Sequence, residues 1–185
     1  MVNLSANVSI KIVKKTYTIF LRAINVSGKN IIKMKELVDV LISNGFDEVK
    51  TYIQSGNLIL KSELNSDELT NKINQLIEQH FQISTEYFVY KIDDLKNIFS
   101  KNPYFEVEDG SKVFLAFLGQ EPKIELLSEF SDQYQFVFVD QVLFFYLPDG
   151  IGKSKFNVSL IEKRMNLKAT ARNVNTIRKI LELGL

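Results

Sequence analysis

The chain has 185 residues, of which 45% are hydrophobic and 24% charged, a composition typical of a folded globular protein. No apolar run approaches the roughly 20 residues of a membrane-spanning helix, and the N-terminal stretch lacks the features of a secretory signal. The chain contains no cysteine, which excludes disulfides and thiolate chemistry, and we expect a cytoplasmic protein that does not enter a membrane.

The net charge of +1 hides an uneven distribution along the chain. Residues 1–62 carry a net charge of +5, residues 63–149 carry −10, and residues 150–185 carry +6. If the two basic ends meet in the folded protein, their fields add and attract an anion. The alternative is a basic surface that has no partner.

The first part of the chain predicts a strand–helix–strand–strand–helix–strand order. The apolar and alternating runs predict strands over residues 17–21, 49–54, 58–60 and 87–90. A helical stripe of apolar residues begins at Met34 and ends near Gly45. A second helix is predicted from Ser66, which we expect to be its N-cap because Asp67 and Glu68 follow in the first turn. This order is that of a ferredoxin-like unit.

The same order of elements then returns. A short helix near residues 95–99 ends before Pro103, and further strands are predicted over residues 113–118, 136–139 and 143–147. Helices are expected after Pro122 and around residues 158–165, and a last helix opens at Asn173. Only residues 168–171 can supply the final strand of the second unit.

These elements predict an α+β fold with two ferredoxin-like halves, antiparallel sheets, helices packed on one face and a C-terminal helix. The expected organisation is an N-terminal extension, a first half, a connecting helix and loop, and a second half with the C-terminal helix, over residues 1–15, 16–92, 93–111 and 112–185. Within the extension, the alternating residues 8–12 predict either a short strand or a tail.

Two polar loops in the basic N-terminal segment are candidates for a ligand site. The first contains Arg22, Asn25, Gly28 and Lys29 and runs into the helix that Lys33 precedes. Free backbone amides, the positive end of a helix dipole and nearby ammonium groups would suit a phosphate or carboxylate. In the alternative interpretation, Asn30 merely caps that helix.

The second loop is the turn that contains Gln54, Ser55, Gly56 and Asn57. These polar residues end an otherwise apolar strand that would lie next to the first loop in a ferredoxin-like sheet. Gly56 and Asn57 both tolerate positive φ, so a turn with no ligand is the alternative.

Two further polar loops lie in the basic C-terminal segment. Residues 150–155 form a glycine-containing loop that ends with Lys155. In residues 170–176, Asn173 is predicted to cap the last helix, and Arg172 could bind an oxyanion with two parallel hydrogen bonds. The alternative partner of Arg172 is a carboxylate from the acidic middle segment.

Catalytic and metal-binding signatures are missing. His80 is the only histidine, and it falls late in a predicted amphipathic helix, so we interpret it as structural. The aromatic residues of strands 136–139 and 143–147 alternate as core residues do, and no RNA-binding signature accompanies them. We therefore expect no metal and no cofactor, and no general base can be named.

These loops resemble a bacterial family that is grouped as domain of unknown function 1697. Its motifs are matched by Leu21–Gly28, by Lys33-Met34, by Thr51–Asn57, by Gly150–Lys155 and by Ala169–Thr176. The resemblance covers about residues 17–183 and implies an α+β fold with ferredoxin-like repeats and a bacterial source, but no activity.

Three residues depart from the family's motifs. Ala23 and Ser27 stand where the family has glycine, which should restrict positive φ in the first loop. Val174 stands where the family has tryptophan, a residue that could stack on a ligand or pack a helix.

The sequence thus predicts a binding site for a phosphorylated or carboxylated small molecule or a nucleotide. The alternatives are a nucleic-acid-binding module and a protein-interaction module with no small-molecule site. The predicted ligand-binding residues are Arg22, Asn25, Gly28, Lys29, Lys33, Gln54, Ser55, Gly56, Asn57, Lys155, Arg172 and Asn173.

Overall fold

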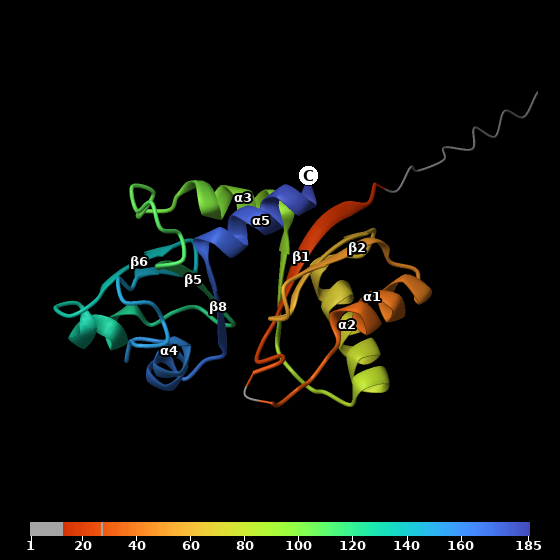
Figure 1. Cartoon of the computed structure of the whole chain (residues 1–185), viewed down its shortest axis with the longest axis horizontal. Helices are drawn as coiled ribbons and strands as arrows, with labels where there is room; N and C mark the ends of the chain where they lie inside the picture. Colours follow the sequence, from red (N-terminus) through yellow and green to blue (C-terminus); the bar gives the residue numbers. More distant parts are fainter. Residues whose placement is uncertain (1–12, 27) are drawn as a thin grey trace, which may run out of the picture.

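The computed structural model describes residues 13–26 and 28–185, which form two lobes side by side (Figure 1). The strand or tail predicted at residues 8–12 and the departure at Ser27 lie outside the described residues. None of the helices in the described part of the chain is long and apolar enough to cross a membrane.

The first lobe contains a four-stranded antiparallel sheet in the order β2-β3-β1-β4. Its strands are β1 (Lys15–Leu21), β2 (Asp47–Tyr52), β3 (Asn57–Ser62) and β4 (Tyr87–Lys91). Its helices are α1 (Met34–Ser43) and α2 (Ser66–Phe81). This is the predicted ferredoxin-like order.

The second lobe has the same strand order, β6-β7-β5-β8. Its strands are β5 (Val113–Leu118), β6 (Gln135–Val139), β7 (Val142–Tyr146) and β8 (Ala169–Asn173). Between them lie η1 (Ile124–Phe130) and α4 (Val158–Met165). The segment after Pro122 is a short 3-10 helix, and the last strand, expected at residues 168–171, is present as β8.

Each sheet has helices on its outer face and the other lobe on its inner face. Apolar residues of α1 and α2 cover the outer face of the first sheet, and those of η1 and α4 cover that of the second. The inner faces share a third core with α3 (Ile92–Ser100) and α5 (Val174–Gly184), which lie along the top of Figure 1. At its centre, the rings of Phe20 and Phe117 stack with centroids 4.5 Å apart.

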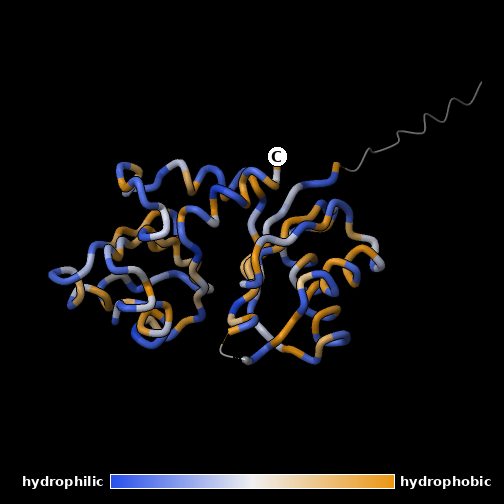
Figure 2. The backbone as a smooth tube through the Cα atoms, viewed as in Figure 1, coloured by the Kyte–Doolittle hydropathy of each residue, from blue (hydrophilic) through white to orange (hydrophobic). Residues whose placement is uncertain are grey.

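Alternation along the strands produces this arrangement. On β1, Tyr17, Ile19 and Leu21 face the outer core, whereas Phe20 faces the inner core. Figure 2 shows how apolar stretches recur between hydrophilic stretches in both lobes. Because both faces of the second sheet are covered, both sets of alternating residues are apolar in its central strand β5, which is fully buried.

The helix starts differ in detail from the sequence expectation. The N-cap of α2 is Asn65, not Ser66: its side chain accepts hydrogen bonds from the backbone N–H groups of Asp67 and Glu68. The Glu68 carboxylate in turn accepts from the Asn65 N–H, which completes a capping box. Lys33, not Asn30, is the N-cap of α1, and its side chain makes no capping bond.

We predict that Asn65→Ala lowers the unfolding free energy by about 1 kcal/mol, because two N–H groups of α2 lose their acceptor. For a protein of this size, the melting temperature should fall by about 2–4 °C. Ser66→Ala is the matched control and should leave the melting temperature nearly unchanged. An equal loss in both variants would contradict the assignment of the cap.

Candidate functional site

The predicted polar loops of the first lobe meet the second lobe along a line that we call the seam. On the first lobe the seam comprises the end of β1 and the turn between β2 and β3. On the second lobe it comprises β8 and one side of α4. Its principal residues are Leu21, Arg22, Ser55, Asn57, Glu162, Thr170 and Arg172.

Arg172 lies at the centre of the seam with only 8% of its surface exposed. Its Nε donates to Asn57 Oδ1, and its Nη2 donates to the carbonyl oxygens of Ser55 (2.9 Å) and Leu21 (3.1 Å). Its Nη1 donates to Thr170 Oγ1 and to the Ala171 carbonyl, both at 2.8 Å. A guanidinium has five N–H donors, so every donor of Arg172 is used.

The acceptors of Arg172 are neutral. No carboxylate among the described residues lies within ion-pair distance of its guanidinium, and the alternative partner, a carboxylate of the acidic middle segment, is therefore not found there. Burial lowers the pKa of Arg172 to about 10, which still leaves the side chain charged at neutral pH. The Phe20 ring lies 5.3 Å from its guanidinium carbon and adds a cation–π contact.

Gly56 brings the acceptors of the first lobe together. A Cβ at this position would lie 2.8 Å from Leu21 Cβ, so only glycine allows the turn to approach β1 this closely. Its φ of +73° also favours glycine. As a result, the Leu21 N–H donates to the Gly56 carbonyl, and the carbonyls of Leu21 and Ser55 both reach Arg172.

The fully buried Asn57 completes this arrangement. Its amide nitrogen donates to the Tyr52 carbonyl and to Ser55 Oγ, while its oxygen accepts from Arg172. Both polar atoms of its side chain are therefore bonded within the protein.

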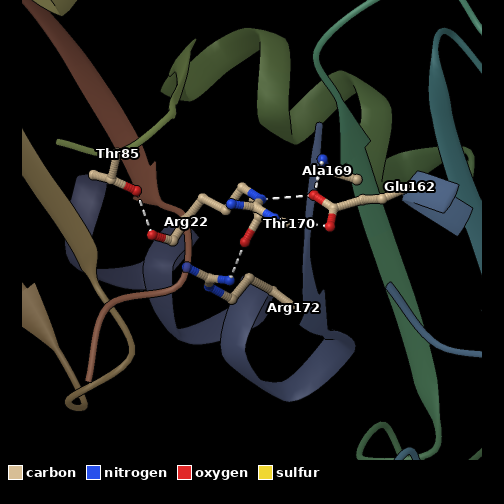
Figure 3. Close-up of polar contacts among 6 residues, drawn as sticks. All are labelled: Arg22, Thr85, Glu162, Ala169, Thr170 and Arg172. Atoms are coloured by element: carbon tan, nitrogen blue, oxygen red, sulfur yellow. Dashed lines mark hydrogen bonds and ion pairs between the residues drawn. The ribbon is translucent and has the colours of Figure 1, made fainter. Parts of the chain in front are cut away.

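Arg22 makes the second link across the seam. It belongs to the first lobe and donates to the second, whereas Arg172 belongs to the second lobe and donates to the first. Its Nε and Nη2 donate to the two carboxylate oxygens of Glu162 at 2.6 and 2.8 Å (Figure 3). Glu162 also accepts from the Ala169 N–H at 2.8 Å, and the Thr85 hydroxyl donates to the Arg22 carbonyl. Burial alone would raise the pKa of Glu162, but the hydrogen bonds from Arg22 and Ala169 outweigh it and the pKa is lowered.

Two other predicted residues hold local structure near the seam. Asn25 donates to the carbonyls of Ile32 and Gln54 and accepts from the Ile32 N–H, so it closes the first loop and ties it to the exposed Gln54. Asn173 is the N-cap of α5, as predicted, and accepts from the Thr176 N–H.

The departures from the family's motifs also have structural roles. Ala23 has φ of +51° despite its side chain, and its carbonyl accepts from the Asn30 amide. The side chain of Ala23 therefore does not prevent the positive φ that was expected to be restricted here. Val174 is buried in the inner core with Ile177, so it packs α5.

The predicted lysines of the first loop lie away from Arg172. Gly28 and Lys29 are exposed. Lys33 is exposed as well and pairs with Glu36 at 2.8 Å. None of the three contacts the guanidinium of Arg172 in the described part of the chain.

Lys155 lies in a separate cavity of about 470 Å³, which we call the loop cavity. This cavity is at the β6–β7 side of the second sheet, whereas Arg172 is on β8 at the opposite edge. It is lined by Gln133, Tyr134, Gln135, Tyr146, Leu147, Pro148, Asp149, Gly150, Lys153, Ser154 and Lys155.

The structure thus brings Arg22, Ser55, Gly56, Asn57 and Arg172 together and places Lys155 elsewhere. Sequence reasoning missed Glu162, although a signal was present. Glu162 is one of two acidic residues in the basic segment 150–185, and a carboxylate among basic residues is a candidate for an ion pair.

The sequence model of a family described as "Protein of unknown function (DUF1697)" matches residues 14–144. The chain belongs to this family. The matched residues contain the first-lobe side of the seam, whereas β8 and the Gly150–Lys155 loop lie beyond them.

One similar solved structure is described as that of the conserved bacterial protein SP0830 from Streptococcus pneumoniae. It has a TM-score of 0.73 and 20% sequence identity, and the match covers 94% of this chain and 100% of that one. At this identity the likeness supports the fold alone. No curated protein matches the chain.

We predict that Arg172→Met lowers the unfolding free energy by about 3 kcal/mol or more, because it leaves buried acceptors of both lobes without donors. Arg172→Lys should cost about 2 kcal/mol, since an ammonium cannot reach five acceptors in a plane. Urea unfolding measures both. The control is Arg178→Lys on the exposed side of α5, which should change little. An unfolding free energy of Arg172→Met close to that of the wild type would contradict the conclusion that Arg172 holds the two lobes together.

The pair of Arg22 and Glu162 predicts a pH dependence. Because the folded pKa of Glu162 is lowered, its contribution is complete above the ordinary value of 4.5 and is lost as pH falls through the folded pKa. Glu162→Gln should therefore cost about 1–3 kcal/mol at pH 7, and this difference from the wild type should shrink below pH 4.5.

Thermal unfolding of both proteins between pH 3 and pH 7 provides the measurement. Glu129→Gln is the matched control, since its pair with Arg164 is about half exposed and should be worth about 1 kcal/mol or less. A constant difference for Glu162→Gln across this pH range would refute the prediction.

Proposed function

We propose that the chain binds a phosphorylated or carboxylated small molecule in the loop cavity. The observation that carries this proposal is the presence of two ammonium groups and a hydroxyl at one concave site. Lys153, Ser154 and Lys155 are consecutive, and all three line the cavity. The volume of about 470 Å³ lies within the range of about 300–1,000 Å³ that small-molecule sites occupy.

The alternative location, the seam, has less to offer an anion. All five N–H donors of Arg172 already bond to protein acceptors. Two of the three guanidinium nitrogens of Arg22 are engaged by Glu162. A ligand at the seam would have to displace bonds that hold the lobes together, and this would cost buried hydrogen bonds.

The polar groups of Lys153, Ser154 and Lys155 can still bond to a ligand. Lys153 and Lys155 are exposed, and neither forms an ion pair within the described part of the chain. Ser154 Oγ accepts from the Phe156 N–H at 3.0 Å, which leaves the hydroxyl hydrogen available to a ligand oxygen. Gly150, with φ of +81°, forms the turn at which the loop enters the cavity.

Charge in the cavity also favours an anion. Among the described residues that line the cavity, Asp149 is the only acidic one, and there are two lysines. A third ammonium, that of Lys112, is close to the loop, since a Cβ at Gly150 would lie 3.9 Å from its Nζ. The local excess of positive charge raises the concentration of anions near the cavity.

We predict that inorganic phosphate, pyrophosphate or succinate raises the melting temperature of the wild type, because a ligand stabilises the folded state that binds it. Lys153→Gln/Lys155→Gln should weaken binding at least about tenfold, since two charge-assisted contacts are lost. Calorimetric titration measures the dissociation constants.

The matched control is Lys29→Gln/Lys33→Gln, which removes the same charge from the other predicted lysine-bearing loop. It should retain wild-type binding. Loss of binding in this control but not in Lys153→Gln/Lys155→Gln would place the site at the first loop and overturn the proposal. No response of the wild type to any of the three anions would overturn it as well.

A further inference from the structure

We infer that the ligand of the loop cavity is a nucleoside phosphate, with its base held by Tyr146 and Gln135 and its phosphate held by the lysines. This inference rests on the proposed function and adds the class of ligand. It is drawn from the aromatic and amide residues that line the same cavity as Lys153 and Lys155.

An aromatic ring and an amide are adjacent in this part of the cavity. Tyr146, at the end of β7, is paired directly with Gln135, at the start of β6. Residues that oppose each other in an antiparallel pair project from the same face of the sheet with neighbouring side chains. The cavity therefore has one π surface and one hydrogen-bonding group side by side.

Two tyrosine rings of the cavity have aromatic neighbours, Tyr146 where it packs against the inner core and Tyr134 where it packs against the outer core. The ring of Tyr146 has Tyr104 as a neighbour, with centroids 6.2 Å apart, and the ring of Tyr134 stacks on Phe156 at 5.1 Å. Both tyrosines are nevertheless partly exposed and line the cavity. A ring that is backed by protein and open to a cavity is a platform on which a base can stack.

The amides have capacity left for a ligand. The side chains of Gln133 and Gln135 are both exposed, and neither makes a hydrogen bond within the described residues. Each carries two donors and an acceptor, the combination that the edge of a nucleobase requires. A sugar phosphate would use the lysines and leave both the ring and the amides without a role.

The test is a calorimetric comparison of AMP, GMP, CMP and UMP with ribose 5-phosphate on the intact protein. At least one nucleotide should bind about tenfold or more tightly than ribose 5-phosphate, since base stacking contributes at this level. Tyr146→Leu should reduce this preference to less than about threefold while the binding of ribose 5-phosphate is unchanged. Gln135→Ala, at an exposed position that does not endanger folding, should reduce the preference or alter the order of the four bases.

The matched controls are Tyr52→Leu and Gln54→Ala in the first lobe, which should keep the wild-type preference. Equal affinities for ribose 5-phosphate and all four nucleotides would overturn the inference and leave the anion site standing. Binding of neither class would overturn both. A preference that survives in both Tyr146→Leu and Gln135→Ala would also overturn the inference.

Discussion

The five N–H groups of Arg172 and the five acceptors around them set how the two lobes meet. Three acceptors belong to the first lobe and two to the second, so the guanidinium is satisfied only when Leu21, Ser55 and Asn57 are all in place. The planar shape of the group fixes the directions of these bonds as well as their number. A rotation or slide of one lobe would leave a buried donor or carbonyl unbonded, which costs more than an exposed bond would.

The polar motifs of the chain have two different roles: some bond the two lobes to each other, and one lines a cavity. The motifs around Arg22, Ser55 and Arg172 satisfy one another across the seam, and the stacked rings of Phe20 and Phe117 pack beside them. The Gly150–Lys155 motif makes no bond to the first lobe within the residues that the structure describes, and it borders a cavity instead. Its lysines are exposed, and neither forms an ion pair within the described residues.

Most of the fold could be predicted from the sequence because the spacing of apolar residues along helices and strands indicates which residues are buried. The predicted N-cap of α2 was wrong by one residue because Asn65 and Ser66 are both favourable N-cap residues. Only the hydrogen bonds of the Asn65 side chain distinguish them. The partners of Arg172 could not be predicted, since the carbonyls of Leu21 and Ser55 carry no signature in the side chains. The separation of Lys155 from Arg172 follows from the strand order, which places β8 and β6 at opposite edges of the sheet.

The position of α5 affects how the chain folds during its synthesis on the ribosome. This helix follows the strands of both sheets in the chain and is therefore synthesised after them, yet its residues Val174, Ile177 and Ile180 complete the core against Phe20 and Ile59 of the first lobe. The first sheet can pair its strands early, but its inner surface stays without its final cover until α5 has been synthesised. During that interval the nascent protein carries an exposed apolar surface of the kind that chaperones bind.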